Sequence, residues 1–400
     1  MSDRPHELPV PEGEYFESNR FAGLSLLLAA VAFVALVLCV VGASVEPAQF
    51  GFSWLFAFGF FFTLCAGCFF WTIVHHAVDA EWSVVVRRQL ENLACLFAVL
   101  AIFFLPVIFL RHHLYAWMNI PLGQDHVLDL KRAYLNWPFF LGRATFCFAF
   151  FITSSLLLRR FSVRQDKNGN PGFTLRMRKL SIISLPLFAL CLTFGACDWL
   201  MSLNYTWFST MWGVYIFAGA AGSSMSLLVL VVTGLRRAGY LQGVVSTEHY
   251  YFMGKWMLAF TVFWAYIAFS QYMLIWYANI PEETQYYLAR TTQSWWILST
   301  LLVFGRFFGP FAILLLQSIK KNPHQLCWVA SWILCMQLLD IYIIVLPALH
   351  GTGVHLSVWD FVPLIGIGAT LAFVYLRIVG RTSLFPLRDP RLIESVRIKN

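Results

Sequence analysis

The chain has 400 residues, of which 59% are hydrophobic and only 12% are charged. Such a surface would not stay in water, so the composition excludes a soluble domain and predicts a polytopic membrane protein. The net charge of +8 could suggest nucleic-acid binding. The distribution of the cations explains it by membrane topology instead, and no nucleic-acid partner is expected.

A membrane-spanning helix needs roughly 20 apolar residues. Ten stretches qualify: 22–42, 53–75, 93–115, 136–158, 180–201, 208–235, 256–278, 294–319, 326–349 and 359–379. Backbone groups in lipid need internal partners, so each stretch is expected to be a helix and the fold all-α. This ten-helix domain (22–379) lies between a polar N-terminal segment (1–21) and a basic tail (380–400) that is expected to be irregular.

The cations indicate the orientation of the ten helices. The N-terminus, the even-numbered connections and the C-terminus share one side and carry 22 of the 28 Lys and Arg residues, whereas the opposite side carries four. Cytoplasmic loops are enriched in Lys and Arg, so both termini are expected in the cytoplasm. The first 20 residues are acid-leaning rather than basic, so 22–42 is interpreted as a retained helix and not as a secretory signal.

An internal repeat is predicted from motifs that recur at nearly one displacement. Asn119-Ile120-Pro121 returns as Asn279-Ile280-Pro281, Gly142-Arg143 as Gly305-Arg306, and Ser53-Trp54 as Thr206-Trp207. We infer two four-helix units, helices 2–5 (about 53–203) and helices 6–9 (about 206–349), flanked by helices 1 and 10. Both units enter the membrane from the same side, so the repeat is parallel.

Polar residues are predicted at one depth in the outer third of the membrane. Arg143 lies 16 residues before Arg159 and Arg306 lies 14 before Lys320, which is roughly 21 to 24 Å from the cytoplasmic face. Similar counts place five more residues at or just beyond this layer: Asp198, Gln271, Asp340, His112 and His113. Four aromatic residues beside it could line a site: Trp207, Trp212, Tyr272 and Trp276.

Buried charges of both signs cost less when they are paired, so these side chains are expected to cluster. One hypothesis is a polar pocket for a quinone headgroup, with a carboxylate or histidine that accepts protons. The alternative is a set of ion pairs that only hold the bundle together. The external segment 116–135 is long enough to cover a pocket or to meet an extrinsic subunit.

Four residues on the cytoplasmic side could begin a proton entry path or could simply be interfacial: His75, His76, Asp79 and Lys255. Histidine is the natural candidate because it titrates near neutral pH. The nine cysteines lie almost entirely within predicted helices. No spacing of Cys or His predicts a metal site, a cluster or covalent haem, so no redox centre is expected in this chain.

Four stretches carry a family resemblance: Asp198–Leu203, Trp207–Tyr215, Ala265–Tyr272 and Leu274–Glu283. Together they resemble the F subunits of bacterial alternative complex III, which are related to the NrfD and polysulfide reductase membrane anchors. The shared motifs include Asp198 and Gln271. The similarity covers nearly the whole chain, least clearly its acidic N-terminal stretch.

The resemblance implies a bacterial inner-membrane subunit of a quinol:cytochrome c (or cupredoxin) oxidoreductase. Its expected partners are a paralogous ten-helix subunit, an iron-sulfur subunit, cytochrome c subunits and lipid. Haem and iron-sulfur clusters are expected only in those partners, and a quinone or quinol is the expected ligand. Two alternatives stay open: a structural anchor without a working quinol site, and a secondary transporter, which would more typically place polar residues near the midplane.

Overall fold

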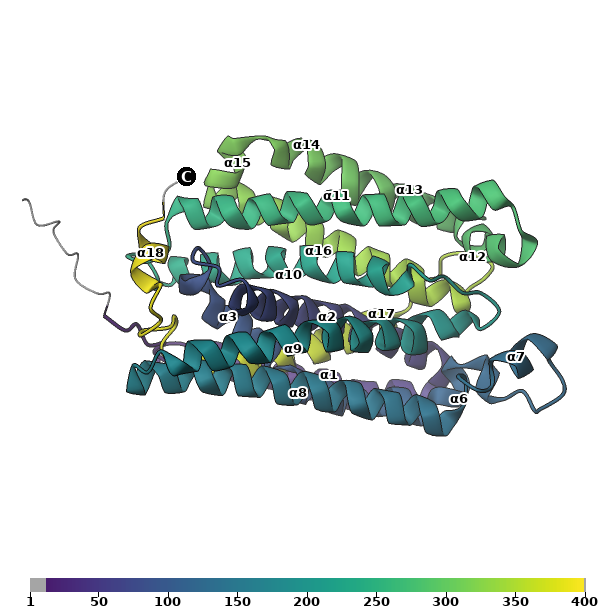
Figure 1. Ribbon diagram of the computed structural model, residues 1–400. Coiled ribbons are helices and arrows are strands. Elements are labelled where there is room, and N and C mark those ends of the chain that lie inside the picture. Colours follow the sequence, from purple (N-terminus) through teal and green to yellow (C-terminus); the bar gives the residue numbers. More distant parts are fainter. Residues whose placement is uncertain (1–11, 399–400) are drawn as a thin grey trace, which may run out of the picture.

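The computed structural model describes residues 12–398, and within this range ten helical segments are long and apolar enough to cross a membrane. This confirms an all-α, multi-pass membrane protein. The segments run along one common axis (Figure 1). In order they are α1 (Ala22–Val45), α2 (Pro47–Ala77), the third segment with α3 (Val84–Ala94), α4 (Phe97–Phe103) and α5 (Leu105–Phe109), α8 (Trp137–Asn168), the fifth segment, which begins with α9 (Gly172–Gly195), α10 (Trp212–Arg237), α11 (Thr247–Ala278), the eighth segment with α13 (Trp295–Val303) and α14 (Gly309–Leu315), α16 (Pro323–Val345) and α17 (Val358–Val379).

Several helices begin well before the stretches that the sequence predicts. The observed starts include Pro47 for α2, Val84 for α3, Gly172 for α9 and Thr247 for α11. In α3 the first turns contain Arg87, Arg88 and Glu91, which hydropathy assigns to a loop. These side chains are buried and paired inside the protein, so the lipid does not meet their charges and local hydropathy does not mark the start of the helix.

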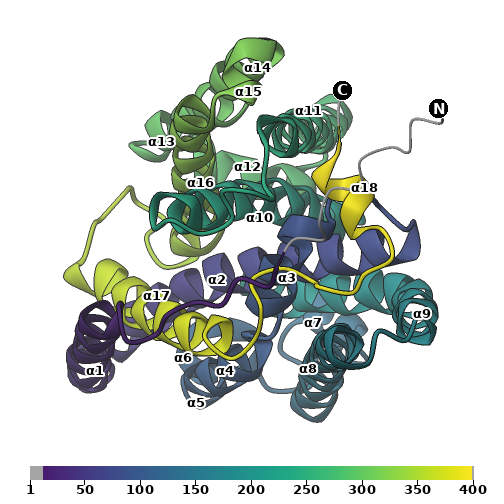
Figure 2. The same cartoon turned by 90° about the vertical axis from the view of Figure 1, so that its left-hand side faces the viewer.

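The two central helices, α2 and α10, pack closely against each other (Figure 2). Around α2 lie the third segment, α8 and α9, and around α10 lie α11, the eighth segment and α16. The two four-helix units inferred from the repeat stay a prediction, because α2 packs on α10 at least as extensively as on any helix of its own proposed unit. Helix α1 packs on α17, which in turn packs on α2.

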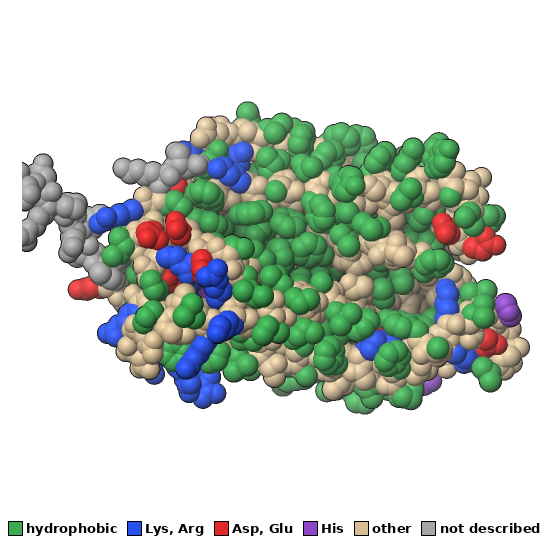
Figure 3. All heavy atoms as spheres, in the orientation of Figure 1, with side chains coloured by type: hydrophobic (Ala, Val, Ile, Leu, Met, Phe, Trp, Pro, Cys, Tyr) green, Lys and Arg blue, Asp and Glu red, His purple; other side chains and the backbone are tan. Residues whose placement is uncertain are grey.

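Hydrophobic side chains cover the middle of the molecule and charged side chains gather near its two ends (Figure 3). We call one end the terminal end, because residues 12–21 and the tail 380–398 meet there through a bridge between Tyr15 and Ser383. The opposite end carries α6 (Arg111–Leu114), α7 (His126–Lys131) and α12 (Pro281–Thr291) (Figure 1).

The C-terminal tail is folded onto the terminal end, and apart from one short helix its described part has the irregular backbone that the sequence predicts. Leu384 and Phe385 are fully buried. The short helix α18 (Leu392–Val396) packs against α3. The composition of the tail is basic and polar, which hides the few apolar side chains that anchor it. Burial of these apolar side chains stabilises the docked tail.

Candidate functional site

A bidentate ion pair joins the fourth and fifth membrane-spanning segments. Arg143 Nε donates to Asp198 Oδ2 at 2.6 Å and Arg143 Nη2 donates to Oδ1 at 2.9 Å, with both residues buried. Asp198 lies in a π-helical turn, Ala196–Leu200, that follows α9. Such turns are frequent at functional sites. The guanidinium also donates to the Tyr134 carbonyl and lies 3.8 Å from the centre of the Tyr134 ring, so three groups hold it in place.

A second ion pair occupies the other four-helix unit. Arg306, in the π-helical turn Phe304–Phe308, has Nη1 3.4 Å from Asp340 Oδ2. Its Nη2 donates to the Gln337 side-chain oxygen, and the Tyr215 hydroxyl donates to Asp340. In this unit, as in the first, the arginine comes from the third helix and the aspartate from the fourth. Both arginines that the sequence places inside helices are therefore neutralised by a carboxylate of their own unit.

The predicted single cluster is replaced by these two separate pairs. Among residues 12–398, no hydrogen bond or ion pair joins Arg143 or Asp198 to Arg306 or Asp340. The expectation that the charges meet in one pocket is wrong in this respect. A buried charge needs a partner within direct contact, and an adjacent helix of the same unit supplies one in each case.

The remaining members of the predicted layer lie outside the pairs. Gln271 is buried and its amide nitrogen donates to the Tyr287 hydroxyl at 3.1 Å. Tyr272 and Trp276 are 39% and 60% exposed. They follow each other at i and i+4 on α11, on the face that points away from the protein. They therefore point out of the helix bundle and do not line its interior.

His112 and His113 are exposed and do not belong to a buried pocket. They lie in α6, beyond the end of the third membrane-spanning segment at Phe109. His112 Nδ1 is 2.8 Å from the Asn119 side-chain oxygen. The depth count that placed both histidines just beyond the polar layer assumed a helix that starts near residue 93, whereas α3 starts at Val84 and the segment leaves the membrane sooner.

A cavity of about 340 Å³ lies beside the first ion pair. Tyr134, Ser202 and Trp207 contribute to its wall. Ser202 donates to the Asp198 carbonyl, and the Trp207 indole nitrogen is buried without a partner among the described residues. Burial and the Asp198 carboxylate raise the pKa of Tyr134 well above its ordinary value, so this phenol is a neutral hydroxyl at physiological pH. Lys131 and neighbouring residues of segment 116–135 form part of the cavity wall. The segment thus covers a pocket, which was one of the two roles expected from its length.

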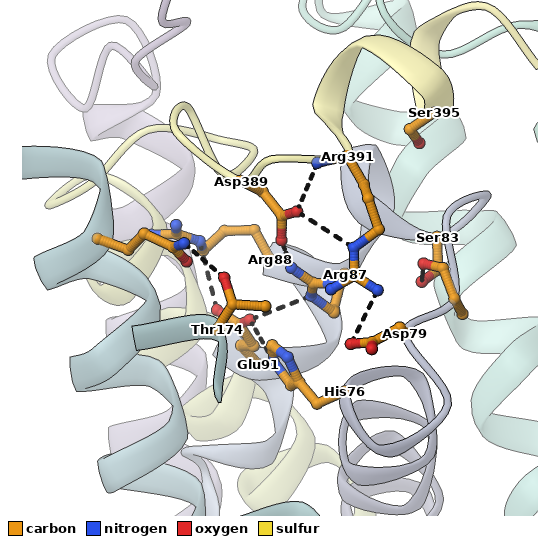
Figure 4. Close-up of polar contacts among 12 residues, drawn as sticks. His76, Asp79, Ser83, Arg87, Arg88, Glu91, Thr174, Asp389, Arg391 and Ser395 are labelled. Atoms are coloured by element: carbon orange, nitrogen blue, oxygen red, sulfur yellow. Dashed lines mark hydrogen bonds and ion pairs between the residues drawn. The ribbon is translucent and has the colours of Figure 1, made fainter. Parts of the chain in front are cut away.

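The terminal end contains a larger ionic cluster that the sequence did not predict (Figure 4). Arg87 and Arg88 are fully buried in α3. Arg88 Nη2 donates to Asp166 Oδ2 of α8 at 2.6 Å, and Arg87 pairs with Asp389 of the tail. Glu91 lies between the two arginines, 3.7 Å from Arg87 Nε and 3.4 Å from Arg88 Nε. The tail thus supplies one of the three carboxylates that balance two buried cations.

Two of the predicted proton-entry residues contact this cluster. His76 Nε2 is 3.3 Å from Glu91 Oε1. Asp79 follows α2 with φ of 54° and is 2.9 Å from Arg391 of the tail. Arg391 also approaches Asp389, so Asp79 and His76 belong to one network that the tail completes.

The other two predicted entry residues lie apart from the cluster's hydrogen bonds. His75 is buried between the rings of Trp71 and Trp82, and neither of its ring nitrogens has a partner in the described part of the chain. Lys255 lies on α11 over the Tyr251 ring, at 4.2 Å. The four predicted residues therefore form no continuous hydrogen-bonded path.

Sequence reasoning also missed a buried carboxylate at the opposite end. Asp360, in the first turn of α17, accepts from Ser53 Oγ at 2.6 Å and from Gln49 Nε2 at 3.0 Å. Gln49 Oε1 in turn is 2.6 Å from His350 Nε2. The available signal was the capping pattern Ser357-x-x-Asp360 at the head of the tenth helix, which marks a helix start but does not reveal the partners.

Residues 12–398 contain no group of three or more His, Cys, Asp or Glu side chains that could hold a metal ion. The nine cysteines are free thiols, and Cys65 and Cys68 are buried among apolar helices. In comparisons with protein-family models and with curated protein sequences, nothing matches this chain.

Proposed function

We propose that the chain is a membrane subunit of a quinol:cytochrome c oxidoreductase of the alternative complex III type. It would lie in a bacterial inner membrane with both termini in the cytoplasm, beside a paralogous ten-helix subunit, an iron-sulfur subunit and cytochrome c subunits. The Arg143–Asp198 pair carries this proposal, because Asp198 belongs to the stretch of the family resemblance and a ligand-sized cavity lies beside the pair.

The cavity can be tested for its fit to a quinone-type ring. Its volume of about 340 Å³ falls in the range of small-ligand sites, which begins near roughly 300 Å³. The Tyr134 hydroxyl would donate a hydrogen bond to one of the ring's oxygen atoms. A bound quinol supplies two electrons, which pass to centres in partner subunits, and two protons.

The residues of this chain would handle protons near the outer face. Asp198 is held as a carboxylate by two N–H donors of Arg143. Tyr134 touches the same guanidinium through its ring and its carbonyl. A proton that reaches this site can reside on Asp198 only if the ion pair with Arg143 loosens.

The experiment measures quinol-dependent cytochrome c reduction by the intact assembly in membranes. Asp198→Asn and Arg306→Ala are each expected to lower turnover per assembled complex, with the amount of complex quantified separately. Glu282→Gln is the matched control, because it also removes one carboxylate, but from an exposed position in α12, at the end of the molecule opposite the terminal end. Unchanged turnover in both test variants would remove the two pairs from the mechanism.

A second function is favoured by one observation. Both pairs are neutral and closed within their own units, which is what a purely structural anchor requires. In that case Asp198→Asn would reduce the amount of assembled complex while turnover per complex stays at the wild-type value. The same experiment therefore separates the two functions.

A further inference from the structure

A second cavity, of about 270 Å³, opens at the terminal end between the start of α1 and the end of α17. Its polar wall consists of Ser18, Asn19, Ser25 and Arg377, and its apolar wall includes Leu26. Leu26 is 73% exposed on the outer face of α1. The cavity is thus polar at the level of the chain ends and apolar toward the membrane interior.

The cation in this cavity has no counter-charge among the described residues of the protein. Arg377 lies in the last turn of α17, exposed, with its guanidinium 5.3 Å from the centre of the Phe373 ring. Within residues 12–398 it makes no ion pair, whereas the buried arginines of α3 each contact at least one carboxylate. The side chains of Ser18, Asn19 and Ser25 also lack hydrogen-bond partners in the same range, so one cation and three polar side chains face a single hollow.

The position of the cavity favours an anion that also carries an apolar part. α1 is the least enclosed span, since only 17% of its most apolar window is buried. Ser25, Leu26 and Ala29 lie on one face of this helix and line the cavity. A ligand there has its charged part beside Arg377 and its apolar part beside lipid-exposed side chains. Basic pockets at the membrane surface bind anionic lipid headgroups.

We propose that this cavity is a binding site for an anionic phospholipid, with the phosphate at Arg377 and an acyl chain along the outer face of α1. The polar side chains before and within the first turn of α1 supply hydrogen bonds to the headgroup. The site is independent of the quinol-oxidising function proposed above, so either can fail without the other.

The test uses native mass spectrometry of the full chain, purified in detergent together with any subunits that remain bound to it. Phosphatidylglycerol is titrated against phosphatidylethanolamine. Phosphatidylglycerol is expected to bind more tightly, and Arg377→Gln is expected to weaken its binding by at least about fivefold, which corresponds to one lost basic contact. Ala29→Trp, which fills the cavity and leaves the charge in place, is expected to weaken it as well.

Arg160→Gln is the matched control, because this arginine is exposed on α8 at the same end and makes no ion pair among the described residues. It is expected to bind like the wild type. Equal affinity for the two lipids, or wild-type binding by both Arg377→Gln and Ala29→Trp, would overturn the proposal. Displacement of phosphatidylglycerol by millimolar inorganic phosphate would assign the site to a free anion instead.

Discussion

The docked tail offers the sharpest prediction, because a single substitution removes the carboxylate that ties it to α3. In Asp389→Asn, the fully buried Arg87 loses its closest partner. Breaking a buried pair from one side costs about 3 to 5 kcal/mol. We expect about 3 kcal/mol here, at the low end of that range, because Glu91 remains 3.7 Å from Arg87.

Hydrogen exchange measures this loss locally. The amides of Leu384 and Leu387 donate to the Glu14 carbonyl and to Asp166 Oδ1, at 2.8 and 2.9 Å. Both hydrogen bonds open when the tail leaves. Since each 1.4 kcal/mol is a factor of ten, their protection is expected to fall about a hundredfold. Glu394→Gln removes the same charge from an exposed position in α18 and is expected to change protection less than threefold.

The same contact predicts how the tail responds to acid. Burial by itself would raise the pKa of Asp389, but Arg87 and the Arg391 amide outweigh burial and hold the pKa below its ordinary value. A depressed folded-state pKa stabilises the docked tail above about pH 3.9 and loses that effect as pH falls through the lower value. Wild-type protection is therefore expected to decline in acid more steeply than protection in Asp389→Asn. Similar protection in Asp389→Asn and in Glu394→Gln at neutral pH would refute this account.

Two further predictions concern packing and charge in the membrane. Gly67→Ala is expected to destabilise the protein by about 1 to 3 kcal/mol or more, because a Cβ would lie 2.1 Å from the Ala220 carbonyl oxygen. Thermal unfolding measures the loss, and Gly142→Ala is the control because Gly142 has open space around it. Arg143→Met is expected to lower the unfolding temperature of the purified protein, and the added change Asp198→Leu is expected to recover much of the loss, since an apolar pair is often as stable as a buried ion pair. A double variant less stable than Arg143→Met alone would show that Asp198 has a second buried partner.

The ten spans and their order follow from the sequence alone. The hydrocarbon core has a fixed thickness, so each spanning helix needs a minimum number of apolar residues. This requirement applies to each stretch separately. The same argument placed Arg143, Arg306, Asp198 and Asp340 away from the membrane surface, where only paired charges are tolerated. These predictions needed no knowledge of which helix touches which.

Only the tertiary structure decided the partners. Arg143 could have met Asp340 by depth alone, yet it pairs with Asp198 because α8 packs against the fifth segment. From the sequence, Arg87 and Arg88 would be assigned to a loop. In the structure, Arg87 is buried and paired with Asp389 of the tail, 302 residues later in the sequence. Hydropathy is a property of each segment, whereas charge neutralisation depends on contacts between distant segments, so packing and not local sequence fixed where these charges lie.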